Sequence, residues 1–536
     1  MWVRFRRWWV DSQTRDSLAE RAEIQRSKHQ NAACPLFPSS TTSAVQNRAE
    51  EREPLEFAPG ICAWHERWNP MNAIPISERI YPHLPVLLQN AACWSYGRRE
   101  RRTRFGRAFD SCLASLLNSE MRGETDIRAY QDDKVKEIIT DAYHHVPYYR
   151  DLMTGLKLAP GDIRCVADLQ KLPILTKETV RQNLERMVSG QANRRELIPR
   201  HTSGTSGKAL HFYSGRDAIA VQWAVWWRHR MRFGLKVGDW HANFTGKLVV
   251  PPGQTRPPYW RWNKPMRQAL LNMHHLTPSK IQAVVGFLNR QEFVFYSGYP
   301  SIIHMLALNA REAGLDLTSR PRVIVTGAEN VYEWQRAEIE RFSKATLTDQ
   351  YGFSEGCGNA SQCPQFVYHE DFEFGVLECV DPQSTGHGRV RGKIVCTGFA
   401  NPHFPFIRYD TGDIGTWESP KVQCACGRRS RVLVGIEGRT EDYVVTPEGG
   451  RIMRFDYIFK DTVNVREAQV VQERLGEIKL RIVRRPEYRI EDECFIANEI
   501  KRWVSPRLGV SFEYVSEIQR ENGDKFKAVK SLVQPR

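Results

Sequence analysis

The stretch that decides the fold is His201-Thr202-Ser203-Gly204-Thr205-Ser206-Gly207-Lys208. Small hydroxylated residues alternate with glycines, so the backbone can approach an anion and donate amide and hydroxyl hydrogen bonds to it. Lys208 adds a positive charge. The spacing differs from a Walker P-loop, because Gly204 and Gly207 are too close together and Ala209 stands where a Ser or Thr would bind Mg²⁺. The segment predicts a phosphate-binding loop, with a Ser- and Gly-rich surface turn as the alternative.

Two later segments end in turns that carry a carboxylate. In Asp349-Gln350-Tyr351-Gly352-Phe353-Ser354-Glu355, the tyrosine ring can stack on a purine, and Glu355 can hold Mg²⁺ against phosphates. Phe406-Ile407-Arg408-Tyr409-Asp410-Thr411-Gly412-Asp413 ends in Asp413, which can accept hydrogen bonds from both hydroxyls of a ribose. Each segment alone is also compatible with an ordinary polar turn.

The centre of the chain alternates strand-like and helix-like segments. We expect a strand at 320–327, a helix at 331–342 and an extended segment at 345–349 that leads into Tyr351. Upstream, the apolar positions of 135–146 recur at helical spacing. This alternation is typical of an α/β domain with its sites at the ends of strands.

The character of the chain changes at two places, which divide it into three parts. Residues 1–70 mix Arg, Ser, Gln and Pro without periodicity, and we expect a disordered tail or an over-extended gene start. Residues 71–440 are expected to form the large domain that binds nucleotide and acid. Residues 441–536 are expected to form a small α+β domain that acts as a lid. Its expected elements are two strands and an amphipathic helix, at 469–471, 477–483 and 491–504.

The composition describes a globular protein with diffuse positive charge. The 536 residues are 41% hydrophobic and 26% charged, with a formal net charge of +15. The dense arginine run at 98–107 is typical of a solvated helix face, and the charge as a whole does not indicate nucleic acid. No apolar run reaches the roughly 18 residues of a transmembrane helix, and Asp11 interrupts the opening MWVRFRRWWV before a signal sequence can form. We therefore expect a cytoplasmic protein without a transmembrane segment.

Taken in order, the four segments TSGTSGK, YGFSE, RYDTGD and GRTED resemble the adenylate-forming superfamily of acyl-CoA ligases. HVPYYR at 145–150, DLQKLPILTK at 168–177 and CACG at 424–427 resemble its phenylacetate–CoA ligase branch, which includes the capsule-biosynthesis CapK proteins. The similarity runs from about residue 71 to 531. It implies an α/β fold in which a large, multi-lobed N-terminal adenylate-forming domain carries a small, mobile α+β C-terminal domain.

The resemblance implies a role for each matching residue. Thr202, Ser203, Gly204, Thr205, Ser206, Gly207 and Lys208 would form the phosphate loop. Gly327, Ala328, Glu329, Tyr351 and Gly352 would line the adenine pocket, with Ala328 departing from the family's Gly. Glu355 would coordinate Mg²⁺, Asp413 and Arg439 would contact ribose or phosphate, and Glu441 beside Asp442 would sit at the hinge. Thr205, Glu355 and Lys525 would be catalytic.

Lys525 would be the mobile lysine that reaches the forming adenylate. When a carboxylate attacks the α-phosphorus and pyrophosphate leaves, negative charge collects at the reacting centre, and an ammonium group there stabilises the transition state. Asp524 replaces the Gly that precedes this lysine in the family. Lys527 and Lys530 are close enough in sequence to be alternatives.

The cysteines suggest a structural metal site. Cys424 and Cys426 flank one residue, and Cys363 and His369 lie in the stretch after YGFSE, where several relatives of this branch carry Cys and His. Four such ligands would make a closed tetrahedral Zn²⁺ site. Cys357 competes for the fourth place, and reduced, unliganded cysteines are the alternative to zinc.

The leading hypothesis is an enzyme that converts a small-molecule carboxylic acid and ATP, with Mg²⁺, to acyl-AMP and pyrophosphate and then transfers the acyl group to coenzyme A. A second enzyme hypothesis replaces coenzyme A by a sugar hydroxyl or amine in surface-polysaccharide biosynthesis. A hypothesis of another class is a non-catalytic nucleotide-binding homologue, and a further one is nucleic-acid binding through the arginine run. The aromatic residues in the region of the acid pocket are expected to belong more to the core than to the pocket: Trp223, Trp226, Trp227, Tyr296, Tyr299 and the pair His274-His275.

Overall fold

The computed structural model describes residues 80–202, 210–251, 253–437, 444–447, 451–452, 455, 458, 464–518 and 529–533. Contacts divide the chain into two units, Met1–Trp68 and Asn69–Arg536, and every described residue belongs to the second. The expectation for residues 1–70 and the proposed boundary at 440 therefore concern residues outside the described part.

A twelve-stranded sheet forms the framework, in the order β11-β12-β13-β14-β10-β9-β8-β7-β6-β3-β5-β4. Its second half is a doubly wound parallel sheet, with β4 antiparallel at the edge. The strands of this half are β3 (His241–Thr245), β4 (Trp260–Asn263), β5 (Gln268–Asn272), β6 (Phe295–Gly298), β7 (Val323–Gly327) and β8 (Thr346–Gly352). The expected strand at 320–327 is confirmed as β7, and the extended segment at 345–349 is confirmed within the longer β8.

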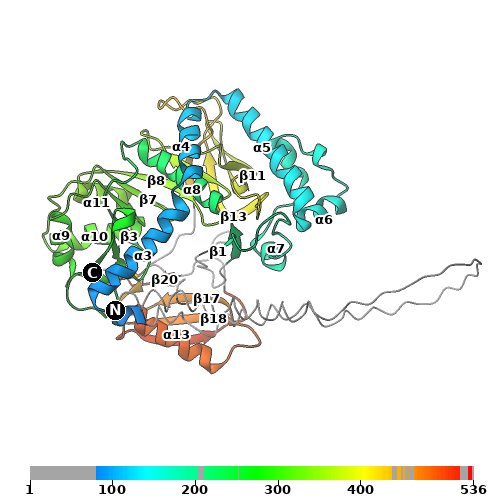
Figure 1. Ribbon diagram of the computed structural model, residues 1–536. Helices are drawn as coiled ribbons and strands as arrows, with labels where there is room; N and C mark the ends of the chain where they lie inside the picture. Colours follow the sequence, from blue (N-terminus) through cyan, green and yellow to red (C-terminus); the bar gives the residue numbers. More distant parts are fainter. Residues whose placement is uncertain are drawn as a thin grey trace, which may run out of the picture. The chain divides into compact units, whose positions relative to one another are not determined.

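Helices cover both faces of the parallel half (Figure 1). On β7 the side chain of Ile324 belongs to the same core as α9 (Ile281–Asn289), α10 (Pro300–Glu312) and α11 (Glu333–Ser343). Val323 and Val325 belong instead to the core formed with α4 (Arg107–Ser119) and α8 (Arg216–Met231). Because successive side chains of a strand point to opposite faces, this division shows an α/β/α arrangement. The predicted helix at 331–342 is confirmed as α11.

The other half of the sheet is antiparallel and was not anticipated from the sequence. Beyond β8 it runs β9-β10-β14-β13-β12-β11, and each neighbouring pair is antiparallel. The strands are β9 (Asn359–Gln362), β10 (Tyr368–Glu370), β11 (Gly375–Gly386), β12 (Arg389–Gly398), β13 (Tyr409–Trp417) and β14 (Val432–Glu437). This half places the RYDTGD segment at the start of β13, three strands beyond β9 in the sheet.

Helices and a hairpin precede the sheet. They are α3 (Val86–Arg104), α5 (Glu124–His145), α6 (Pro147–Gly155), α7 (Lys177–Gln182), β1 (Ile198–His201) and β2 (His211–Ser214). Short 3₁₀ turns lie at Tyr81–His83, Pro160–Asp162, Val166–Lys171, Lys264–Met266 and Met273–His275. The helical periodicity of 135–146 is confirmed within α5, where Val135, Ile138, Ile139 and Ala142 are buried. Pro147 ends this helix as expected, and it also begins α6.

The described C-terminal residues form a second, four-stranded sheet in the order β19-β18-β17-β20. Its elements are β17 (Val465–Gln472), β18 (Glu477–Arg484), α13 (Ile490–Trp503), β19 (Gly509–Tyr514) and β20 (Val529–Ser531), preceded by β15 (Val444–Val445) and β16 (Arg451–Ile452). Gly476 makes the turn between β17 and β18 with φ +84°. The two strands and the helix expected from the sequence are confirmed. Within the described residues, no helix has both the length and the apolar character that a membrane crossing requires.

Candidate nucleotide and acid site

Two neighbouring parallel strands carry the central residues of the site. Thr326 and Gly327 at the end of β7 pair with Asp349 and Gln350 of β8. The segments that follow, 327–329 and 351–355, therefore leave the sheet at the same edge. The carboxyl edge of a parallel sheet is where α/β proteins bind ligands. The structure thus brings together the adenine-pocket and magnesium residues predicted from the sequence.

Glu355 lies in the turn between β8 and β9 and is 6% exposed. The hydroxyl of Tyr409, which is fully buried at the start of β13, donates a hydrogen bond to Glu355 Oε1 across 2.6 Å. No described cation is ion-paired with Glu355. A hard divalent cation prefers such carboxylate oxygens, and a donor on one oxygen orients the other. The Glu355 carboxylate therefore fits the predicted role of a Mg²⁺ ligand.

Asp413 lies beside the tyrosine of the YGFSE segment. The hydroxyl of Tyr351 donates to Asp413 Oδ2 across 2.9 Å, and burial raises the pKa of Tyr351 well above its ordinary value. Tyr351 therefore stays a neutral donor at physiological pH. This contact joins β8 to β13 and places the predicted ribose-binding carboxylate next to the predicted adenine-stacking ring.

The PILTK segment holds the RYDTGD segment in place. Leu175 pairs with Tyr409 in a parallel bridge, and Asp410 N donates to Leu175 O across 3.0 Å. Lys177 Nζ donates to Thr411 O across 3.3 Å. The PILTK segment therefore positions Tyr409, the tyrosine that contacts Glu355.

The phosphate-loop segment follows β1 and precedes β2 in the chain, and its described ends, Thr202 and Leu210, contact each other. Thr202 N donates to Leu210 O, and Leu210 N donates to Thr202 Oγ1 across 3.0 Å. Residue 200, at the end of β1, reaches the magnesium segment, since Arg200 Nη2 donates to Ser354 O across 3.4 Å. Several predicted residues lie outside the described part: Ser203, Gly204, Thr205, Ser206, Gly207, Lys208, Arg439, Glu441, Asp442 and Lys525.

Two backbone positions explain residue choices in the adenine segment. Ala328 has φ +68°, a left-handed conformation that costs an L-residue about 1–2 kcal/mol. This strain accounts for the glycine that the family pattern has there. At Gly352 a Cβ atom would lie 2.5 Å from Asn359 Oδ1, so only glycine fits. Glu329 Oε2 accepts a hydrogen bond from Ser301 N in the first turn of α10, across 3.2 Å.

The predicted cysteine and histidine ligands converge. One ligand atom from each of Cys363, His369, Cys424 and Cys426 lies within 4.8 Å of all the others. His369 Nδ1 lies 3.3 Å from Ser430 O, so this nitrogen can donate to the carbonyl while Nε2 faces the thiols. Cys357 is not in the group. Three thiols and one imidazole nitrogen match the donor set of a structural zinc site.

The comparisons with known proteins agree with this geometry. A family model described as the CapK C-terminal domain matches residues 444–532. Over 456 residues the chain is 23% identical to Protein CapK of Staphylococcus aureus, which covers 83% of this chain and 97% of that protein. It is 26% identical over 340 residues to phenylacetate-coenzyme A ligase of Thermus thermophilus, covering 60% of this chain and 72% of that enzyme.

The chain therefore resembles the phenylacetate–CoA ligase and CapK branch of the adenylate-forming superfamily. The relatives with a named activity are phenylacetate-coenzyme A ligases. A solved structure of 2-hydroxyisobutyryl-CoA ligase, in complex with 2-HIB-AMP and CoA in the thioesterification state, matches with a TM-score of 0.51 and 19% identity. The match covers 77% of this chain and 91% of that one, and it shows that the fold is shared.

Three residues that sequence reasoning left without a role contact the candidate site. They are Tyr409, Lys177 and Arg200, which contact Glu355, Thr411 and Ser354. Tyr409 and Lys177 lie inside segments that carried the family resemblance. Their position in these motifs could therefore have marked them as candidate site residues. Of the aromatic candidates, Trp227, Tyr296, His274 and His275 are buried in the core, while Trp223, Trp226 and Tyr299 are half-buried.

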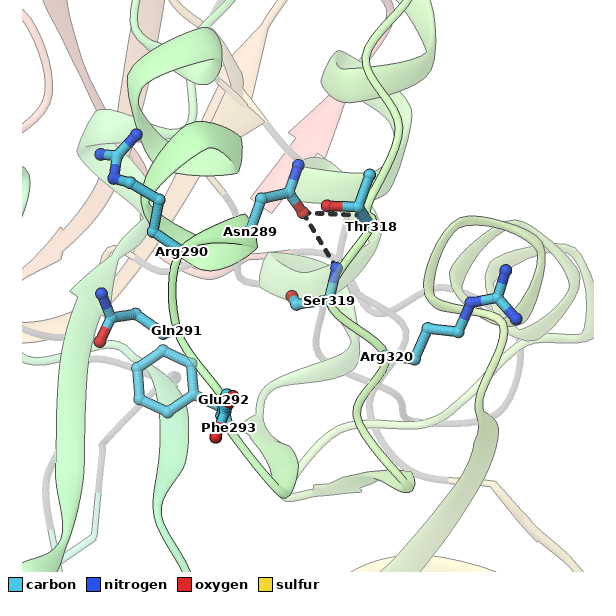
Figure 2. A pocket seen from close by; sticks show the side chains of 8 residues that line it. All are labelled: Asn289, Arg290, Gln291, Glu292, Phe293, Thr318, Ser319 and Arg320. Atoms are coloured by element: carbon cyan, nitrogen blue, oxygen red, sulfur yellow. Dashed lines mark hydrogen bonds between the residues drawn. The ribbon is translucent and has the colours of Figure 1, made fainter.

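A pocket of about 390 Å³ lies elsewhere (Figure 2). It is lined by Asn289, Arg290, Gln291, Glu292, Phe293, Thr318, Ser319 and Arg320. These residues precede β6 and β7, so the pocket lies at the amino ends of the strands, whereas Gly327 and Glu355 follow the carboxyl ends. Asn289 Oδ1 accepts from Thr318 N across 2.8 Å and from Ser319 N across 3.3 Å. The pocket is therefore separate from the adenylate site.

Proposed function

We propose that this protein activates a small carboxylic acid with ATP and then transfers the acyl group to coenzyme A. In the first step a carboxylate oxygen of the acid attacks the α-phosphorus of ATP, and pyrophosphate leaves with the bond's electron pair. In the second step the sulfur of coenzyme A attacks the acyl carbon, AMP leaves, and the thiol proton is released.

The observation that carries the proposal is the juxtaposition of Glu355, Tyr409, Tyr351 and Asp413. They come from segments up to about sixty residues apart and are joined by two hydrogen bonds, Tyr409 to Glu355 and Tyr351 to Asp413. When Mg²⁺ is bound it supplies charge neutralisation for the phosphates. The residues of this chain orient the groups: Glu355 holds the metal, and Asp413 holds the ribose.

Lys525 and the loop at 203–208 complete the proposal as predictions from the family resemblance. Lys525 would stabilise the charge that develops on the α-phosphate, and the loop would bind the β- and γ-phosphates. We expect Lys525→Ala to abolish adenylate formation and to leave ATP binding nearly intact, whereas Lys527→Ala, at an alternative position for this lysine, should retain exchange. Exchange within a few-fold of wild type in Lys525→Ala would remove this lysine from the mechanism.

The experiment that tests the activity is acid-dependent ATP–pyrophosphate exchange across aryl, fatty and amino acids, followed by an assay for the CoA thioester of the best acid. The expected result is exchange with at least one acid and thioester formation. ATP binding without exchange on any acid would favour the non-catalytic homologue instead.

The CapK similarity favours a second acceptor class. Because the match to Protein CapK covers 97% of that protein, and the CapK C-terminal model covers residues 444–532, a sugar hydroxyl or amine is the alternative acyl acceptor. Transfer of the activated acyl group to coenzyme A, compared with transfer to amino and hydroxyl acceptors, separates the two. The cytoplasmic location remains a prediction.

We also propose that Cys363, His369, Cys424 and Cys426 bind a structural Zn²⁺. Cys363 follows β9, His369 lies on β10, and the other two lie in the connection between β13 and β14. An ion held by all four would join this connection to the β9–β10 hairpin, directly after the turn that carries Glu355. Its role would be to brace that turn.

A further inference from the structure

Beside Glu355 lies a group of arginine side chains that the adenylation mechanism does not use. Arg200 comes from β1, Arg104 from the last turn of α3, and Arg230 from the last turn of α8. Arg200 donates to Ser354 O, next to Glu355. The guanidinium groups of Arg104 and Arg230 both lie over the ring of Trp223, at 4.1 and 5.6 Å from its centroid. We call these three side chains the guanidinium cluster.

Arg230 is a cation without an acidic partner among the described residues. Its guanidinium contacts the rings of Trp223 and Trp227, and its Nε atom is buried without an acceptor. Among the described residues no carboxylate lies within ion-pair distance of Arg230. Burial and the nearby Arg104 lower the pKa of Arg230 to about 10. Arg230 is only partly exposed, and a largely desolvated charge without a described counter-ion is costly, so its position favours binding of an anion.

The rest of the cluster also carries excess positive charge. Arg104 is ion-paired with Glu100, and Lys247 Nζ lies 3.6 Å from the same carboxylate. Arg200 has no described carboxylate within ion-pair distance. Burial and the nearby charge of Arg104 lower the pKa of Arg200, although the charge of Glu355 acts to raise it. Glu100 is thus shared by two cations. Arg104 and Lys247 therefore contact Glu100, while Arg200 senses the charges of Arg104 and of the proposed metal ligand Glu355.

The cluster lies on other elements than those proposed to hold adenine and ribose, and Arg200 lies two residues before Thr202. The residues proposed for adenine and ribose come from β7, β8 and β13, whereas the cluster comes from α3, β1 and α8. Half-buried indoles continue it: the rings of Trp223 and Trp226 lie 5.0 Å apart, and Trp226 Nε1 donates to Asn359 Oδ1 across 3.1 Å. Asn359 is the residue that packs against Gly352 at the end of β8. Guanidinium groups suit an anion, and half-buried indoles beside them suit the apolar part of the same molecule.

We propose that the acid activated here carries a second anionic group, which binds the guanidinium cluster while the first carboxylate reacts. This inference rests on the proposed function and narrows its substrate class to dicarboxylates and other acids with an additional negative charge. Arg230 and Arg200 are specificity-determining residues, since charge-assisted hydrogen bonds to guanidinium groups are among the stronger polar contacts.

The test compares acids that differ by one carboxylate in pyrophosphate exchange: hexanoate with adipate, and phenylacetate with 4-carboxyphenylacetate. We expect kcat/KM to favour the doubly charged member of a pair by about 10-fold or more. Arg230→Gln and Arg200→Gln should remove most of this preference by raising the KM of the doubly charged acid. Arg230→Lys should retain part of it, and Arg99→Gln, at an exposed position of α3, should retain all of it.

The outcomes separate the inference from the function. Exchange that favours the singly charged acids overturns this inference and leaves the proposed function in place. No exchange with these pairs or with the wider panel of acids overturns both. A rise in the KM of ATP with an unchanged preference among acids assigns the cluster to the phosphates and overturns the inference. An unchanged preference in Arg200→Gln, together with a loss of stability alone in the Arg230 variants, makes the cluster structural.

Discussion

The contact between Tyr409 and Glu355 yields a prediction whose size follows from the structure. Tyr409→Phe removes one hydroxyl from a hydrogen bond of 2.6 Å between two buried side chains. A hydrogen bond to a charged acceptor is worth about 1.5–3 kcal/mol, and loss of a residue that orients a metal ligand typically reduces metal affinity by about 10–100-fold. Since a factor of ten in affinity equals about 1.4 kcal/mol, the energy of the hydrogen bond and the expected loss of metal affinity agree.

The assay is pyrophosphate exchange as a function of Mg²⁺ concentration. We expect Tyr409→Phe to raise the Mg²⁺ concentration for half-maximal exchange by about 10-fold or more. Tyr149→Phe is the matched control, because Tyr149 is 2% exposed and its hydroxyl donates to Pro405 O and accepts from Ile407 N without touching Glu355. Both variants should lose about 1–2 kcal/mol of stability. An equal Mg²⁺ requirement in both variants would refute the role given to Tyr409.

Three further predictions concern the surroundings of the site. Metal analysis should find zinc in the wild type and much less zinc in Cys424→Ser. Cys494→Ser is the control and should keep its zinc, because Cys494 is exposed and is not one of the four proposed ligands. Equal zinc content in all three proteins would exclude Cys424 as a ligand. Ala328→Gly should stabilise the protein by up to about 1 kcal/mol in thermal unfolding, because it relieves the left-handed strain at some cost in chain entropy; a lower melting temperature would contradict this. Burial raises the pKa of Asp349 to about 6, so its folded form binds a proton more tightly than the unfolded chain, and its contribution to stability is lost as pH rises from about 4 to 6. Urea unfolding of Asp349→Asn should lack this loss, whereas an identical pH profile would place the titration elsewhere.

Local patterns predicted two strands and one helix of the parallel half and three elements of the C-terminal sheet. The elements at 320–349 and 469–504 appear with shifts of a few residues, since apolar periodicity reports directly on burial in helices and strands. The antiparallel half could not be anticipated in the same way. Its strands mix buried and exposed residues without a regular alternation, as β13 does. In addition, β10 pairs with β14, which lies more than sixty residues later in the sequence. Register between distant strands depends on tertiary packing.

The residues of the candidate site were also predictable only in part. Glu355 and Asp413 were predictable as candidates because small, polar motifs mark ligand-binding turns, but the turn expected at Asp413 is wrong, since this residue lies within β13. The contacts that give them a geometry were not predictable, because Tyr409 and Arg200 reach the site only through the sheet order and the β1–β2 hairpin. The cation surplus around Arg230 is also invisible in the sequence, where arginines at 104, 200 and 230 are unrelated positions among 77 Lys and Arg residues.

The most direct test of the central claim is acid-dependent pyrophosphate exchange by the wild type and by Glu355→Gln, measured with saturating ATP at matched Mg²⁺ concentrations. If Glu355 holds the metal at the reacting phosphates, the wild type should exchange pyrophosphate only when an acid is present, and the variant should be slower by about 100-fold or more. Exchange by Glu355→Gln at a rate close to that of the wild type would contradict the assignment of this edge of the sheet as the adenylation site.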